Sequence, residues 1–187
     1  VVTPEVHARV MREIIQPTLD AMAAEGMPYT GFLYAGLMID AEGRARVVEF
    51  NCRMGDPETQ PILMRLQSDL ADLVEAALAG ALDRVEAQWD ARVALGVVMA
   101  AAGYPDAPRK GDAISGLPAP GADLHVFHAG TTTADGQLRT AGGRVLCVTA
   151  LGSSVREAQQ LAYQAADAIR FDGCQYRRDI GHRAVAR

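Results

Sequence analysis

The sequence predicts an α+β fold for this chain of 187 residues. Three observations support the prediction. Two pairs of strand-like segments are each joined by a polar turn, at 40–43 and at 135–136, as in antiparallel hairpins. Segments with apolar residues at helical spacing occur at the start, in the middle and near the end of the chain. In the second half, a strand, a hairpin, a second strand and a helix make a small layered unit.

The first predicted element is a helix with clear start and stop signals. Thr3 suits the N-cap and Pro4 the first helical position. We expect Pro17 to kink or break the helix near Gln16, and Gly26 to end it. The apolar stripe of this helix consists of Val6, Val10 and Ile14.

A hairpin and a second helical region follow. Residues 29–39 are predicted as a buried strand, which the turn at 40–43 brings antiparallel to a strand at 46–51. Apolar residues at helical spacing then predict a helix over 62–78, and Ser68-Asp69 is a point at which it can break into two.

A shift to polar composition predicts a domain boundary near residue 90, which gives domains 1–90 and 91–187. The long loop 103–121 is either functional or a floppy connector. A capping box at Ser154-x-x-Glu157 predicts the start of the last long helix. The strands of this half are expected at 93–102, 124–129 and 144–151, with a loop or hairpin arm over 131–143.

Composition excludes several classes of function. The formal net charge is −5, aromatic residues are few and there is no block of basic residues, so nucleic acid is not expected as a partner. No segment approaches the roughly 20 apolar residues that cross a bilayer, and no signal peptide opens the chain, so we expect a cytoplasmic protein without a membrane partner. The three cysteines are scattered, which argues against a disulfide framework or a zinc site. The chain begins Val-Val-Thr-Pro without Met, so we expect a piece of a longer protein.

The stretch Val47–Gln60 carries the strongest signal for chemistry. On a strand of period two, Glu49, Asn51 and Arg53 share one face. Glu49 and Asn51 offer the oxygen ligands that Mg²⁺ prefers, and the Arg53 guanidinium suits phosphate or carboxylate oxygens. The alternative is an ordinary solvated face. The opposite face, made of Val48, Phe50 and Cys52, is predicted to be buried.

The residues after this strand predict an anion site. Gly55-Asp56-Pro57 is a turn sequence, Thr59 suits a helix cap, and Pro61 suits the first helical turn. The free N–H groups of that helix would then face Arg53. Two weaker candidates, the pair His125 and His128 and the charged tail 176–181, are interpreted as packing and surface residues.

The chain resembles the phosphoribosylamine–glycine ligases, also called glycinamide ribonucleotide synthetases, of the ATP-grasp superfamily. The resemblance covers nearly the whole chain. It rests on the motifs Y-T-G-F-L-Y-A-G-L-M-I, E-F-N-C-R-M-G-D-P-E-T-Q-P, V-F-H-A-G-T, G-G-R-V-L-C-V-T-A-L-G and Y-R-R-D-I-G. It implies the C-terminal half of an ATP-grasp fold followed by a small α+β C-terminal domain. The implied activity is ATP-dependent ligation of glycine to 5-phosphoribosylamine, through a glycyl phosphate, in purine biosynthesis.

The resemblance also implies roles for individual residues. Glu49 and Asn51 match the family's Mg²⁺ (or Mn²⁺) ligands. Arg53 matches the catalytic arginine that stabilises the transferring phosphoryl group. The implied substrate-binding residues are Asp56, Glu58, Thr59, Gly142, Gly143 and Arg144.

The resemblance leaves gaps and alternatives. The N-terminal glycine-rich domain and the lid that clamps ATP are absent from the sequence, so the missing N-terminal portion is an expected partner and the isolated chain is expected to be inactive. Residues 29–39 offer no carboxylate for a second metal ion. The alternatives are another ATP-grasp carboxylate–amine ligase, such as a biotin-carboxylase-like protein, and a non-catalytic module.

Overall fold

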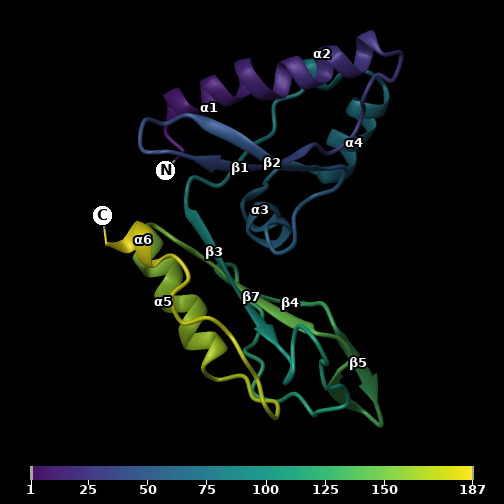
Figure 1. Ribbon diagram of the computed structural model, residues 1–187. Coiled ribbons are helices and arrows are strands. Elements are labelled where there is room, and N and C mark those ends of the chain that lie inside the picture. Colours follow the sequence, from purple (N-terminus) through teal and green to yellow (C-terminus); the bar gives the residue numbers. More distant parts are fainter. Residues whose placement is uncertain (1, 187) are drawn as a thin grey trace. The chain divides into compact units, whose positions relative to one another are not determined.

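A computed structural model describes residues 2–186, and these residues form two compact units. Within that range, the first unit contains 2–55 and 70–86, and the second contains 56–69 and 87–186. Helices and antiparallel strands occur in both units (Figure 1), which confirms the α+β prediction. Compactness does not decide where a family's domain boundary lies, so the boundary near residue 90 stays a prediction.

The first unit opens with a helical segment that Pro17 does not break. It consists of α1 (Pro4–Val10), a π-helical turn (Met11–Ile15) and α2 (Gln16–Ala24). Pro17 cannot donate a backbone hydrogen bond, and the π turn just before it changes the pairing so that Gln16 N–H donates to the Met11 carbonyl. The Thr18 hydroxyl donates to the Ile14 carbonyl at 2.7 Å. The helix is therefore not broken at Pro17, and the irregularity expected near Gln16 takes the form of this π-helical turn.

The predicted ends of this helix are confirmed. The Thr3 hydroxyl accepts a hydrogen bond from Val6 N–H at 3.3 Å. Gly26 takes a left-handed conformation with φ of 78°, and the next residue, Met27, donates back to the Met22 carbonyl. Val6 is buried against the turn that contains Gly43.

The first sheet is a two-stranded hairpin of β1 (Tyr34–Ile39) and β2 (Ala45–Asn51). The Asp40 carboxylate organises its turn by accepting from the N–H groups of Glu42 and Arg44. The strand prediction for 29–33 is wrong. There the Tyr29 hydroxyl donates to the Phe32 carbonyl and Gly31 has a φ of 142°, so the segment is a local loop.

The apolar face of β2 is exposed, and the prediction of burial is wrong for all three residues. Val48 is 66% exposed and Phe50 is 39% exposed, and Cys52 is also exposed. Period two does separate an apolar from a polar side, but a two-stranded sheet buries a face only where another layer covers it. No helix of the described first unit covers these side chains.

The helical region after the loop is two helices, as the Ser68-Asp69 signal predicted. α3 (Thr59–Arg65) belongs to the second unit, and α4 (Leu70–Leu78) belongs to the first. Between them the chain pairs briefly with the segment before β3: Leu66 forms a bridge with Trp89, and Gln67 N–H donates to the Gln88 carbonyl. A short 3₁₀ turn (Leu82–Arg84) follows α4.

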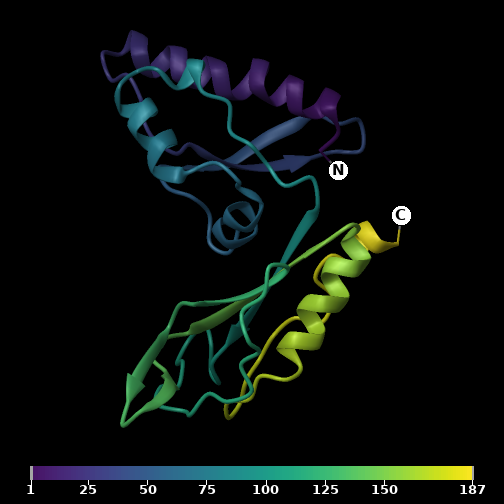
Figure 2. The same ribbon diagram turned by 180° about the vertical axis from the view of Figure 1, so that it is seen from behind.

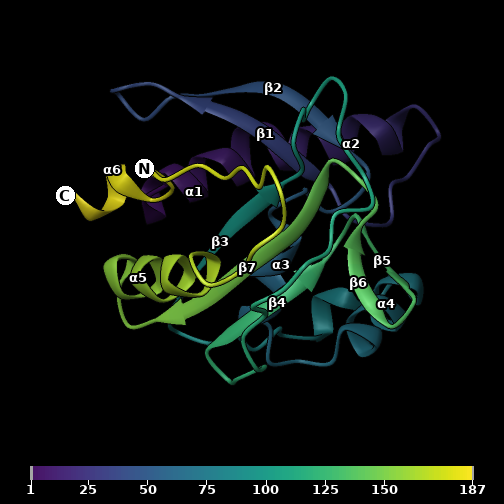
Figure 3. The ribbon, with the colours of Figure 1, turned by 90° about the horizontal axis from the view of Figure 1, so that it is seen from below.

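The second unit is built on a three-stranded antiparallel sheet in the order β3-β7-β4 (Figure 3). Its strands are β3 (Val93–Ala100), β4 (Leu124–His128) and β7 (Arg144–Gly152). The central strand β7 is buried from Val145 onward because both of its faces are covered. α5 (Val155–Ala166) covers one face, and α3 packs against β3 and β7 through Pro61, which lies close to Gly96.

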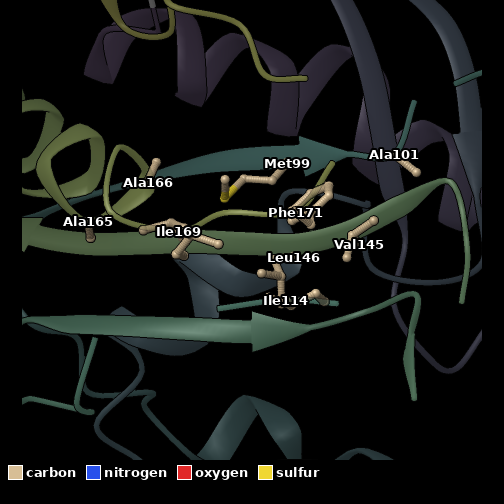
Figure 4. Packing of buried hydrophobic residues seen from close by; sticks show 10 residues of the cluster. Met99, Ala101, Ile114, Val145, Leu146, Ala165, Ala166, Ile169 and Phe171 are labelled. Carbon is tan, nitrogen blue, oxygen red and sulfur yellow. The ribbon is translucent and has the colours of Figure 1, made fainter. Parts of the chain in front are cut away.

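α5 lies on one side of this sheet (Figure 2). The main core lies on that side, where side chains of β3 and β7 meet those of α5 and of the segment after it (Figure 4). Met99, Leu146 and Ile169 are at most 2% exposed. Beside it, a second cluster joins β3, β7 and α5 through Leu95, Val97, Ala150, Ala158 and Ala162.

The remaining predictions for this unit are largely confirmed. β5 (Thr131–Ala134) and β6 (Gln137–Thr140) form the expected hairpin about Asp135-Gly136. The Ser154 hydroxyl caps α5 by accepting from Glu157 N–H, whereas the Glu157 carboxylate accepts from Ser153 rather than from Ser154. The loop 103–121 is tied to β6 through the Thr140 and Leu138 carbonyls, so it is not a floppy connector.

The charged tail is held by α5. The Tyr163 hydroxyl donates to the Arg177 carbonyl at 2.7 Å and accepts from Ile180 N–H at 3.0 Å. Gln159 donates to the Ile180 carbonyl at 2.7 Å. After these contacts the chain enters the short helix α6 (His182–Val185). No helix within the described residues has the length and apolar character needed to cross a membrane.

Candidate functional site

The first group of predicted site residues lies on β2 in the first unit. Glu49 and Asn51 are two residues apart on this strand and therefore point to the same face. Across the hairpin, Glu49 is opposite Gly36 and Asn51 is opposite Tyr34. The two oxygen-bearing side chains are thus adjacent, as the alternation predicted.

Arg53 lies beyond this regular alternation. β2 ends at Asn51, so the pleat of the strand does not set the direction of the Arg53 side chain. Its guanidinium Nη1 donates to the Met54 carbonyl at 3.1 Å. The prediction that the strand continues to Arg53 is therefore wrong, and the residue lies just after the strand end.

The Asn51 side chain has an unsatisfied polar atom. Its amide Nδ2 is buried and has no hydrogen-bond partner within the described structure. A buried amide normally finds a partner, because leaving one unpaired costs about 1–3 kcal/mol. The unpaired atom is the amide nitrogen, which donates hydrogen bonds, so it does not itself mark a metal site. The donors that fit a hard cation are the Glu49 carboxylate and the Asn51 amide oxygen. Among the described residues, no three His, Cys, Asp or Glu side chains form a metal-binding group.

The second group lies in the second unit and brings together residues that are 88 positions apart in sequence. Arg144, at the start of β7, donates from Nη1 to the Asp56 backbone carbonyl at 3.2 Å. Its Nη2 lies 3.4 Å from the Asp56 carboxylate. The structure therefore joins two of the predicted substrate-binding residues in one ion pair.

Three glycines make this arrangement possible. A Cβ on Gly130 would lie 2.6 Å from the Cα of Gly142, so the two backbones cross in direct contact. A Cβ on Gly143 would lie 2.6 Å from the ring of Tyr104. The close packing at Gly142 and Gly143 fixes the chain just before Arg144, which is a structural reason for glycine at both predicted positions.

Glu58 and Thr59 lie at the start of α3, in the same unit as Asp56. Glu58 occupies the N-cap position and Thr59 is the first helical residue, so the prediction that Thr59 caps the helix is wrong.

The Asp56 carboxylate also affects Cys147 on β7. Burial raises the pKa of the Cys147 thiol, the Thr149 hydroxyl lowers it, and the negative charge of Asp56 raises it to a smaller extent than burial does.

The two groups belong to different units. The first group offers a carboxylate, an amide and an arginine. The second offers the ion pair of Asp56 and Arg144. Two glycines precede Arg144 in the sequence, and α3 begins shortly after Asp56.

Family models identify both parts of the chain. Residues 1–59 match the phosphoribosylglycinamide synthetase ATP-grasp (A) domain, and residues 94–183 match the phosphoribosylglycinamide synthetase C domain. The chain belongs to the phosphoribosylglycinamide synthetase family. Glu49, Asn51, Asp56, Glu58 and Thr59 fall in the A-domain match, and the site glycines with Arg144 fall in the C-domain match.

Curated relatives of this family cover the whole chain but are longer than it. The phosphoribosylamine–glycine ligase of Ralstonia nicotianae is 62% identical over 187 residues, and that of Allochromatium vinosum is 63% identical over 188 residues. In each comparison the match spans all of this chain and 44% of the relative. The chain therefore spans less than half the length of these curated relatives.

Solved structures agree with the family assignment. The crystal structure of phosphoribosylamine–glycine ligase from Thermotoga maritima is similar, with a TM-score of 0.83 and 39% identity over 96% of this chain and 44% of that one. The biotin carboxylase domain of Hydrogenobacter thermophilus 2-oxoglutarate carboxylase, solved with MgADP, ADP and bicarbonate, matches 94% of this chain and 38% of its own. Its TM-score is 0.61 and its identity is 17%, so it shows a shared fold alone.

Sequence reasoning missed Tyr104, which packs on Gly143, because no pattern links a loop residue to a glycine 39 positions away. The other candidates make local contacts. His128 Nδ1 lies 3.1 Å from the Thr131 hydroxyl, and the His125 ring packs edge-on against Phe127. In the tail, Arg177 is paired with Asp179.

Proposed function

We propose that this chain supplies the C-terminal part of a phosphoribosylamine–glycine ligase. The proposed reaction joins glycine to 5-phosphoribosylamine with ATP and gives glycinamide ribonucleotide, ADP and phosphate. The observation that carries the proposal is the adjacent pair of Glu49 and Asn51 on β2, inside the segment that matches the family's ATP-grasp domain. The high identity to full-length ligases from two bacteria supports the same reaction.

In this proposal Glu49 and Asn51 hold Mg²⁺ or Mn²⁺ through a carboxylate and an amide oxygen. Their adjacent positions on the same face of β2 support this role. A metal ion held by these two residues would supply positive charge to offset the negative charge that develops during phosphoryl transfer. Arg53, next to the strand end, orients a phosphoryl oxygen by two parallel hydrogen bonds.

The second group binds the substrates that receive and carry the acyl group. Asp56 orients an amine and Arg144 binds an anion. The ion pair between the two side chains holds them next to each other. Glu58 and Thr59 contribute at the start of α3. At Gly142 and Gly143 a ligand can approach the backbone closely, because glycine has no side chain.

The remaining requirements of the reaction come from elsewhere in the proposed enzyme. We expect the nucleotide clamp and the phosphoribosyl site to come from the part of the ligase that this chain does not match, because the chain spans 44% of its relatives. A site shared between segments loses its preorganisation when one wall is removed. The chain alone is therefore expected to be inactive.

The test is complementation. A fusion ligase is made by replacing the matching segment of the Ralstonia nicotianae enzyme with this chain, and ADP release is measured with ATP, Mg²⁺, glycine and 5-phosphoribosylamine. We expect turnover by the fusion ligase and none by the chain alone. Glu49→Gln should lower turnover by several orders of magnitude with unchanged folding, because the substitution removes the charged ligand.

Thr132→Ala, on the exposed hairpin strand β5, is the control and should leave turnover unchanged. Near-normal turnover of the Glu49→Gln fusion would remove Glu49 from the metal site. An inactive fusion ligase with normal folding would count against the ligase reaction itself.

A further inference from the structure

Gly36 occupies a position where the backbone does not require glycine. Its φ lies outside the left-handed region, unlike that of Gly31 and Gly43 in the same unit. Glycine in the interior of a strand weakens the strand and often marks a close approach of another group. The reason for glycine at position 36 must therefore be sought in its neighbours.

The neighbour of Gly36 is Glu49. The two residues are directly opposite each other in the antiparallel register of β1 and β2. A Cβ at position 36 would lie 3.1 Å from Glu49 Cγ, closer than such contacts normally are, and 3.6 Å from the Glu49 backbone oxygen. The Glu49 side chain thus crosses the neighbouring strand over the space left by the missing side chain.

The arrangement is specific to this pair. One step along the same face, Tyr34 lies opposite Asn51 and carries a full side chain. The register of the hairpin shifts directly after Gly36, between Gly36 and Leu37, so Gly36 is the last residue of β1 that pairs before the irregularity. A Cβ at position 36 would displace Glu49 Cγ, which lies near the start of the side chain. A small rotation there moves the carboxylate at the end of the side chain by a larger distance.

We infer that Gly36 is a positioning residue: its lack of a side chain lets Glu49 lie across β1 with its carboxylate directed to the metal ion. The inference rests on the proposed function, in which Glu49 is a metal ligand. Gly36 itself touches neither the metal ion nor a substrate. The competing explanation is that glycine at this position serves the strand irregularity alone.

The test compares Gly36→Ala and Gly36→Val in the fusion ligase with Ala35→Val, the matched control. Ala35 is the neighbouring residue of β1, is opposite Phe50 and faces away from Glu49. The affinity for Mn²⁺ is measured by electron paramagnetic resonance in the presence of ADP, and thermal unfolding is followed on the same samples. The Mg²⁺ concentration that gives half-maximal turnover is the second measurement.

We expect Gly36→Val to weaken Mn²⁺ binding by about tenfold or more, the effect seen when a group that orients a metal ligand is lost. Gly36→Ala should weaken it less, because one carbon displaces Glu49 by only a fraction of an ångström. Both variants should raise the Mg²⁺ requirement in the same order. Ala35→Val should change neither quantity.

The inference is overturned if Gly36→Val binds Mn²⁺ normally while Glu49→Gln does not, or if Ala35→Val weakens binding as much as Gly36→Val does. Should Gly36→Val fold poorly, the Mn²⁺ affinity of Gly36→Ala decides by the same criterion. Normal Mn²⁺ binding by Glu49→Gln is a different result. It would overturn the metal assignment of the proposed function, and the role of Gly36 with it.

Discussion

The two units of this chain bury their apolar residues to very different extents. Among the described residues, Val6 is the one buried apolar side chain of the first unit. The second unit contains all the other buried apolar residues, arranged around a central strand that is covered on both faces. Yet both units contain well-paired antiparallel strands.

The difference teaches that strand pairing and core formation are separate requirements. The hairpin of β1 and β2 has a turn fixed by Asp40 and paired residues on both sides of one register shift, but its apolar side chains reach solvent. The sheet of the second unit is stabilised by burial as well, since α5 supplies a layer that the first hairpin does not have. Burial, rather than hydrogen bonding, is the larger net contribution to stability.

The largest expected contrast is between two methionines on comparable strands. Met99 on β3 is fully buried, whereas Met38 on β1 is 67% exposed. Met99→Ala should lower the free energy of unfolding of the second unit by about 2–5 kcal/mol, because it leaves a cavity in a close-packed core. Met38→Ala should change stability by about 0.5 kcal/mol or less.

Urea unfolding checks this contrast. Trp89 is the single tryptophan of the chain and lies in the second unit, so its fluorescence reports on that unit. Hydrogen exchange by mass spectrometry reports on β1 and β2. Equal losses of stability in the two variants would show that the first hairpin is as well buried in solution as the second sheet.

Local signals in the sequence were good predictors in both units. Thr3 and Ser154 mark helix starts, Gly26 marks a helix end, and polar turns mark the hairpins, because each of these depends on a few consecutive residues. The same is true of the adjacency of Glu49 and Asn51, which follows from the period of a strand. These features do not need the rest of the fold.

A few local predictions failed, among them the strand over 29–33 and the helix cap at Thr59. The features that sequence patterns missed altogether are contacts between residues far apart in sequence. Burial of Phe50 depends on a covering layer, and the alternation of apolar residues does not tell whether that layer exists. The pairing of Arg144 with Asp56 and the packing of Tyr104 on Gly143 likewise depend on how loops meet. The resemblance to a known family placed Asp56 and Arg144 in one site, whereas the spacing of residues did not.

A smaller contrast is expected between the two capped helices. Ser154→Ala removes the hydroxyl that accepts from Glu157 N–H and should lower the stability of the second unit by about 1 kcal/mol. Thr3→Ala removes the matching bond to Val6 N–H. We expect Thr3→Ala to increase amide hydrogen exchange in α1 and to leave the urea unfolding transition measured by Trp89 fluorescence unchanged. A shift of the Trp89 transition by Thr3→Ala would mean that the two units unfold together.

The smallest expected effect is a dependence on pH that distinguishes two partly exposed ion pairs. The Arg92 side chain and its backbone N–H lower the pKa of Asp90 to about 2, and Arg44 lowers the pKa of Asp40 in the same way. A depressed carboxyl pKa in the folded state stabilises the protein above the unfolded value of about 4. For Asp90 this contribution should be lost as the pH falls from about 4 to about 2.

Asp90→Asn should therefore destabilise the second unit at pH 7. The difference in free energy of unfolding between this variant and the parent chain should shrink as the pH falls from about 4 to about 2. The difference is small because both partners reach solvent, where screening weakens the pair. Urea midpoints from Trp89 fluorescence at pH 7, 4 and 2.5 measure it. Asp40→Asn is the matched variant of the first unit and should leave these midpoints unchanged at every pH. A difference for Asp90→Asn that stays constant down to pH 2.5 would show that its hydrogen bonds, rather than its charge, stabilise the second unit.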